Sequence, residues 1–165
     1  MNIKIANQFL NKAEIKENQN ILIYGASGSV GTYAIQLAKY FNTTVTAVCG
    51  PTNLDLVKSL GADKVLDYTT QDIYKIEDKF DIIFDAVGKI SKTNSKRLLN
   101  SKGKYVSVTG SAKNKKGDLK FIKDIIEKRK LITVIDKKYD LEQIREAHSY
   151  VENFHKKGNV VINVT

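Results

Sequence analysis

The sequence predicts an α/β protein with a doubly wound parallel sheet and helices on both faces. Two observations predict it: short apolar runs suited to buried strands recur along the chain, and stretches with helical spacing of apolar residues separate them. With 165 residues, 42% of them apolar and 27% charged, the chain fits one globular domain with a sizeable core. The expected strands are residues 21–24, 44–49, 64–68, 81–87 and 104–109.

Helix patterns connect the expected strands. Residues 29–41 place their apolar side chains on one stripe. Residues 53–60 repeat this spacing and end at Gly61, which suits a helix C-cap. Further helix patterns lie at residues 92–100, 119–129 and 141–154, and the last strand is expected in "NVVINV".

The net charge of +9 invites a nucleic-acid interpretation, because clustered cations bind phosphate backbones. The distribution of the charge argues against it. The arginines are Arg97, Arg129 and Arg145, and the lysines are spread along the whole chain. Specific recognition of phosphate or guanine usually uses the planar arginine fork. We therefore expect no nucleic-acid partner.

Metal and membrane partners are not expected either. Cys49 is the single cysteine, and with His148 and His155 as the imidazoles of the chain no zinc site is expected. No apolar run approaches the roughly 20 residues of a membrane helix, and the first residues lack the pattern of a signal peptide. The sequence therefore predicts a cytoplasmic protein.

A glycine turn joins the first expected strand to the first expected helix in "ILIYGASGSVGTYAIQLAKYF", residues 21–41. In this setting the glycine spacing indicates a Rossmann-type dinucleotide site. Gly28 would let the backbone approach a pyrophosphate, and Gly31 would let the helix lie close to the strand. Free N–H groups of the first helical turn then face the anion. A glycine turn without a ligand is the alternative.

The end of the second expected strand bears on which dinucleotide would bind. A carboxylate there would hold the ribose 2′-OH of NAD, but residues 49–53 contain no acid. The missing negative charge leaves room for a 2′-phosphate, so NADP(H) is preferred over NAD(H). No Arg or Lys lies between Lys39 and Lys58, so the phosphate would rely on polar groups such as Thr52 and Asn53.

Four segments in order carry a resemblance to a known family: "ILIYGASGSVGTYAIQLAKYF", "LVKSLGADKVLDYTTQD", "FDIIFDAVGK" and "LLNSKGKYVSV". The chain resembles the cofactor domain of the medium-chain dehydrogenase/reductase superfamily, in its zinc-independent quinone oxidoreductase-like and alcohol dehydrogenase-like subgroup. The likeness covers nearly the whole chain. It implies direct hydride transfer between nicotinamide and a carbonyl, enone or quinone, with the protein positioning the reactants. No catalytic residue is identified.

By this resemblance, three groups of residues would bind the nicotinamide dinucleotide. The pyrophosphate would contact Gly25, Ala26, Ser27, Gly28, Ser29, Val30 and Gly31. The adenosine phosphate would lie among Cys49, Gly50, Thr52, Asn53 and Tyr68. The ribose and nicotinamide would contact Asp85, Ala86, Val87, Gly88, Val108, Thr109 and Gly110. Structural alternatives are packing under the loop for Tyr68, a place in the core for Cys49, and capping of the next turn for Asp85, which is the favoured role of that residue.

The resemblance also implies a domain division. Residues 1–130 would form the Rossmann domain, with residues 1–20 as a leading helix or linker, and residues 131–165 the closing part of a substrate domain. The N-terminal substrate domain is expected to be absent, and the segment between Gly110 and Leu119 is too short for the family's further strand. The chain is then either an oxidoreductase whose pocket another chain completes, or a domain that binds NADP(H) without turnover, including an inactive remnant. A partner chain or a homo-oligomer would cover the exposed closing segment.

Overall fold

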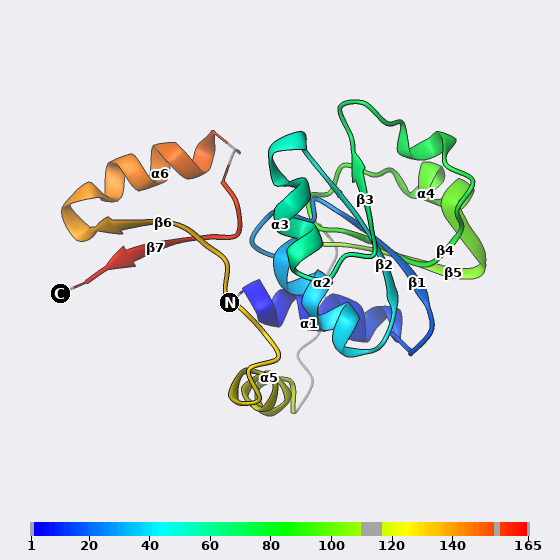
Figure 1. Cartoon of the computed structure of the whole chain (residues 1–165), viewed down its shortest axis with the longest axis horizontal. Helices are drawn as coiled ribbons and strands as arrows, with labels where there is room; N and C mark the ends of the chain where they lie inside the picture. The colour runs from blue at the N-terminus through cyan, green and yellow to red at the C-terminus, as the bar shows by residue number, and fades with distance from the viewer. Residues whose placement is uncertain (1, 110–116, 154–155, 165) are drawn as a thin grey trace.

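The computed structural model describes residues 2–109, 117–153 and 156–164. The main strands are β1 (Asn20–Tyr24), β2 (Thr44–Cys49), β3 (Lys64–Asp67), β4 (Phe80–Asp85) and β5 (Leu99–Ser107). They form one parallel sheet in the order β3-β2-β1-β4-β5, on the right of Figure 1. This arrangement confirms the predicted fold class and, among the described residues, the sheet of five strands.

Helices cover both faces of the main sheet. They are α1 (Asn2–Ala13), α2 (Gly31–Tyr40), α3 (Leu54–Ser59) and α4 (Lys92–Leu98), with the short turns η1 (Pro51–Asn53) and η2 (Ile73–Lys75). A further helix, α5 (Asp118–Glu127), packs against α1. Ile21 and Ile23 of β1 belong to one apolar cluster with α1, α2, α3 and α5, whereas Leu22 belongs to a second with α4 and η2. Successive strand residues point to opposite faces, so the sheet is covered on both.

The first helix is part of the core. Ala6, Phe9, Leu10 and Ala13 recur at helical spacing and are buried in the larger cluster. The Phe9 ring lies 5.7 Å from the Phe84 ring of β4, measured between centroids. The leading segment therefore contributes a helix that shields one face of the sheet.

Several predicted boundaries were wrong. The strand predicted at residues 104–109 spans Leu99–Ser107 and so begins five residues earlier. Two further shifts have a clear physical cause. The helix predicted at residues 92–100 ends at Leu98, because Leu99 already pairs with Phe80 of the neighbouring strand. The strand predicted at residues 81–87 ends at Asp85, because the Asp85 carboxylate accepts the backbone N–H groups of Val87 and Gly88, which therefore do not pair within the sheet. In both places a contact with another group sets the end of the element.

A two-stranded parallel sheet follows α5. It pairs β6 (Ile135–Asp140) with β7 (Asn159–Asn163), which are connected through η3 (Leu141–Gln143) and α6 (Ile144–Glu152). Figure 1 shows this unit on the left, beside the main sheet. The helix pattern at residues 141–154 and the last strand are thus confirmed over their described residues. Val160, Val161 and Ile162 are half-buried, whereas Ile135 is 44% exposed.

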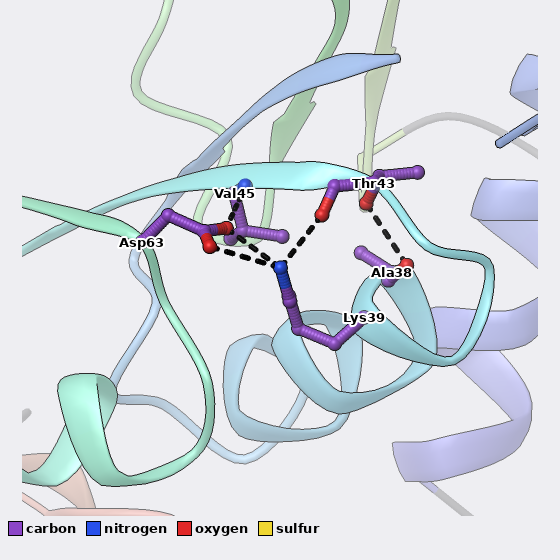
Figure 2. Close-up of polar contacts among 5 residues, drawn as sticks. All are labelled: Ala38, Lys39, Thr43, Val45 and Asp63. Atoms are coloured by element: carbon purple, nitrogen blue, oxygen red, sulfur yellow. Dashed lines mark hydrogen bonds and ion pairs between the residues drawn. The ribbon is translucent and has the colours of Figure 1, made fainter. Parts of the chain in front are cut away.

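A charged side chain ties α2 to the sheet, as Figure 2 shows. Lys39 Nζ donates to the Thr43 carbonyl at 2.8 Å and to both carboxylate oxygens of Asp63 at 2.8 and 3.0 Å. Asp63 Oδ2 also accepts from the Val45 backbone N–H at 2.7 Å. Partial burial raises the pKa of Asp63, but the bonds from Lys39 and Val45 outweigh it and hold this pKa below its ordinary value of 3.8.

We expect Asp63→Asn to lower the free energy of unfolding by about 1 kcal/mol at neutral pH, a modest loss because the Asp63 side chain is 42% exposed. A carboxyl group whose pKa is lower in the folded than in the unfolded state stabilises the fold at pH values above its unfolded-state pKa. This stabilisation is lost as the pH falls through the folded-state pKa. The difference in free energy of unfolding between wild type and variant should therefore be constant near neutrality and shrink below pH 3.8. Urea unfolding at several pH values measures it. Asp124→Asn on the exposed face of α5 is the control, and an equal pH dependence of both variants would contradict the prediction.

Candidate functional site

The glycine turn begins where β1 ends. The backbone N–H groups of Gly25 and Ala26 both donate to the Val48 carbonyl, at 3.1 and 3.0 Å, which joins the turn to β2. Gly25 has a φ of +75°, a conformation that other residues rarely adopt. A Cβ there would also lie 3.0 Å from a Val87 methyl group. The turn is therefore fixed against the ends of both neighbouring strands.

The two following glycines serve different purposes. A Cβ on Gly31 would come within 2.7 Å of the Ala26 Cα and closer still to the Gly25 carbonyl oxygen, so this glycine lets α2 start against the turn. A Cβ on Gly28 would meet the Gly25 carbonyl oxygen at 3.4 Å, an ordinary contact, and would otherwise project into open space. Gly28 thus presents bare backbone that a phosphate can approach.

The end of β2 lies beside this turn. Asn53 Nδ2 donates to Ser27 Oγ at 3.3 Å, which brings two predicted site residues together. Asn53 Oδ1 is buried and has no hydrogen-bond partner among the described residues. A buried acceptor without a donor is costly, so it suits a ligand hydroxyl group. The open Gly28 backbone and this oxygen together fit a nucleotide.

The side chains of Cys49 and Tyr68 differ in their exposure to solvent. The Cys49 side chain is buried in the core, and burial, assisted by Asp67, raises the pKa of its thiol to about 11. The structural alternative for Cys49 is therefore confirmed for its side chain. Tyr68 is 54% exposed, and a Cβ on Gly50 would lie 3.3 Å from the Tyr68 hydroxyl oxygen. Tyr68 thus borders the β2 end rather than packing in the core.

A pocket of about 430 Å³ opens next to Tyr68. It lies between the loop after β3 and the loop after β4, and its lining includes Tyr24, Tyr68, Tyr74, Lys89 and Ile90. Sequence reasoning missed Tyr24, Tyr74 and Lys89. The position of Tyr24 as the last residue before the glycine turn was the one available signal, because the other two reach the pocket through tertiary folding.

Asp85 is fully buried and organises the loop after β4. Its carboxylate accepts hydrogen bonds from the backbone N–H groups of Val87 at 3.1 Å and of Gly88 and Ile90 at 2.7 Å. The Tyr105 hydroxyl lies 3.1 Å from the same carboxylate. The capping role predicted for Asp85 is confirmed. Its effect is to hold Val87, 48% exposed, over Gly25.

The turn after β5 completes this edge of the sheet. The Val108 N–H donates to the Asp85 carbonyl at 3.1 Å, and the Thr109 hydroxyl lies 3.0 Å from the Ser107 hydroxyl. Gly88 is next to Thr109, since a Cβ on Gly88 would collide with the Thr109 methyl group. Gly110 lies outside the described residues. The predicted residues that are described therefore gather at the carboxyl ends of the five strands of the main sheet, with Tyr68 following β3.

A distant segment also reaches the glycine turn, a contact that no sequence pattern predicted. The Gly158 N–H donates to the Ser27 carbonyl at 2.8 Å, and Gly158 forms a parallel bridge with Gly28. Lys156 Nζ hydrogen-bonds to Ser29 Oγ and, at 3.0 Å, to the Gly158 carbonyl. The chain between α6 and β7 thus returns to the start of α2.

Comparison with known proteins places this chain in a family. A family model described as zinc-binding dehydrogenase matches residues 29–152. The chain belongs to this family. It corresponds to the cofactor domain of the medium-chain dehydrogenase/reductase superfamily, and it is of the quinone oxidoreductase-like type.

Relatives and solved structures agree with this family assignment. The chain is 35% identical over 173 residues to the chloroplastic NADPH-dependent alkenal/one oxidoreductase of Arabidopsis thaliana, covering 97% of this chain and 44% of that protein. It is 36% identical to the chloroplastic quinone-oxidoreductase QR1 of Triphysaria versicolor, covering 93% and 55%. The structure of the quinone oxidoreductase from Coxiella burnetii superposes with a TM-score of 0.89 at 28% identity, covering 98% and 58%. The chain thus spans about half the length of these family members.

Among the described residues, no three His, Cys, Asp or Glu side chains are grouped so that they could hold a metal ion. In the same part of the chain, no helix has both the length and the hydropathy that a membrane span requires.

Proposed function

We propose that the chain is the NADP(H)-binding domain of an oxidoreductase that moves a hydride between nicotinamide and a carbonyl, enone or quinone. The observation that carries this proposal is the turn after β1, where Gly28 presents open backbone beside the ends of β2 and β4. The family and the relatives named as alkenal/one and quinone oxidoreductases support it.

The pyrophosphate would lie on the backbone N–H groups that precede α2. Those of Ser29 and Val30 donate no hydrogen bond within the described residues, and the positive end of the helix dipole faces the same way. Asn53 Oδ1 would accept a bond from a ribose hydroxyl. The bound nicotinamide supplies the hydride chemistry. Val87 contributes an apolar surface beside the turn.

NADP(H) fits the end of β2 better than NAD(H). Residues 49–53 carry no carboxylate. A carboxylate there would bind the ribose 2′-OH of NAD(H) and would repel the 2′-phosphate of NADP(H). Exposed Thr52 and the Tyr68 hydroxyl beside Gly50 offer polar contacts to the phosphate instead. The relative named as NADPH-dependent supports the same choice. We propose that this chemistry uses no zinc.

The closing residues 131–165 belong, in this proposal, to the end of a substrate domain. Ile135, Leu141 and Ile144 are each more than 40% exposed on the β6–β7 unit, which suits coverage by another chain or a second copy. Residues 1–130 would then form the cofactor domain. The predicted cytoplasmic location remains a prediction, since the two relatives named above are chloroplastic.

Titration of the purified chain with NADPH and with NADH tests the proposal. Nicotinamide fluorescence gives the affinities, and the melting temperature gives an independent readout, because a ligand of the native state raises it. We expect NADPH to bind at least about tenfold more tightly than NADH, a difference of about 1.4 kcal/mol. A cooperatively folded chain that binds neither nucleotide would refute the function. Equal affinities would refute the preference for NADP(H).

A Gly28→Asp variant tests whether the turn is the site. Its side chain would project into the open space over the turn and bring a negative charge to the pyrophosphate position. We expect NADPH affinity to fall about 100-fold or more while the melting temperature of the free protein changes little. Ser101→Asp adds the same charge at the start of β5, on the opposite edge of the parallel sheet, and should bind NADPH like wild type. Equal affinities of the two variants would place the nucleotide elsewhere.

A further inference from the structure

The glycine turn lacks a cation of its own. No Lys or Arg lies between Lys16 and Lys39 in the sequence, and Lys39 is engaged with Asp63 at the far end of α2. A pyrophosphate carries negative charge on both of its phosphates, which backbone N–H groups and a helix dipole compensate only in part. A site for this group therefore gains from a positive side chain brought in by tertiary structure.

Lys156 lies where such a cation is needed. Its Nζ bonds to Ser29 Oγ, in the turn that leads into α2, and to the Gly158 carbonyl at 3.0 Å. The adjacent bond from the Gly158 N–H to the Ser27 carbonyl, at 2.8 Å, and the bridge between Gly158 and Gly28 fix the backbone that carries it. The position of Lys156 is thus set by backbone pairing as well as by its own side chain.

The ammonium group of Lys156 has no anionic partner in the described part of the chain. No carboxylate oxygen of residues 2–109, 117–153 and 156–164 lies within 4.0 Å of Lys156 Nζ, the limit for a salt bridge. Asp136 is the carboxylate that acts on it electrostatically, but Asp136 Oδ2 already accepts bonds from the Tyr150 hydroxyl at 2.6 Å and the Lys157 N–H at 2.9 Å. Burial accordingly lowers the pKa of Lys156, only partly offset by Asp136.

An ammonium group has three N–H donors, and the two described acceptors leave one for a ligand. A partly buried cation without a counter-ion is a cost to the fold that an anion would relieve. Backbone N–H groups of the turn and the Lys156 ammonium would then contact the same phosphate from two sides.

We propose that Lys156 is a cofactor-binding residue that neutralises the pyrophosphate at the glycine turn. This inference rests on the proposed function. It assigns the closing segment a direct part in binding the dinucleotide, although this segment lies more than 120 residues from the turn in the sequence.

The test compares Lys156→Gln, Lys156→Arg and Lys157→Gln, with NADPH and NADH as probes at several salt concentrations. Lys157→Gln is the matched control, because it removes the same charge from the adjacent residue, whose backbone N–H bonds to Asp136. We expect Lys156→Gln to weaken both nucleotides by a similar factor of about tenfold, and the salt dependence of binding to become flatter, because one charge pair is lost. Lys156→Arg should stay within about threefold of wild type.

The remaining outcomes each decide against the inference. A loss confined to NADPH would assign Lys156 to the 2′-phosphate instead of the pyrophosphate. Unchanged affinities for Lys156→Gln would show that the cation takes no part in binding. If Lys156→Gln weakened nucleotide binding with unchanged salt dependence and a lowered melting temperature, Lys156 would have only a structural role. A wild-type chain that binds neither nucleotide would overturn the proposed function as well, so the two failures are distinguishable.

Discussion

A Gly31→Ala variant is expected to lose about 3 kcal/mol of unfolding free energy, which corresponds to a fall in melting temperature of about 10 °C for a chain of this size. The added Cβ would overlap the backbone of Gly25 and Ala26, and backbone held by the bonds to Val48 cannot move aside cheaply. The higher helix propensity of alanine, at most about 1 kcal/mol, does not offset this overlap.

Gly28→Ala is the control for this prediction. Its Cβ would make one ordinary contact of 3.4 Å, so the unfolding free energy should change by less than about 1 kcal/mol. Thermal and urea unfolding of both variants measure the difference. If Gly28→Ala were as destabilised as Gly31→Ala, close approach of α2 to the turn would not be the reason for the glycine at position 31.

A Phe9→Ala variant should lose a comparable or larger amount, about 3–4 kcal/mol. Phe9 is 4% exposed and packs its ring against Phe84 in the central part of the sheet, so truncation leaves a cavity between α1 and β4. The loss would appear in urea unfolding as a lower midpoint with the same slope.

Phe9→Leu is the matched variant, because it keeps most of the apolar volume while removing the ring pair. We expect it to cost about half as much as Phe9→Ala. Two variants with wild-type stability would show that α1 is not part of the cooperative core, contrary to its burial against the main sheet.

The order of the main elements could be predicted because each depends on local pattern. Apolar runs such as that of β2 are short and continuous, since a strand covered on both faces needs no polar side. The helix α1 was harder to predict, because the sequences of an amphipathic helix and a polar linker differ by few residues. Its role in the core follows from contacts such as that between Phe9 and Phe84. Likewise, the ends of β4 and α4 depend on Asp85 and on the pairing of Leu99.

The glycine turn was predictable because its function is encoded in consecutive residues. Gly25, Gly28 and Gly31 each permit a backbone path or a close approach that a side chain would block, so their spacing is itself the signal. The family resemblance rests on the same contiguous segments, and the match over residues 29–152 confirms it.

The sequence by itself therefore determined the fold class, the family and the position of the turn. Only the tertiary structure decided what surrounds that turn: the orphan oxygen of Asn53, the pocket beside Tyr68, and Lys156 on Ser29. These groups come from segments far apart in the chain, and no local pattern indicates which of the many lysines will lie beside the turn. The physical reason is that packing and backbone pairing, as between Gly158 and Gly28, fix such distances after the elements have formed.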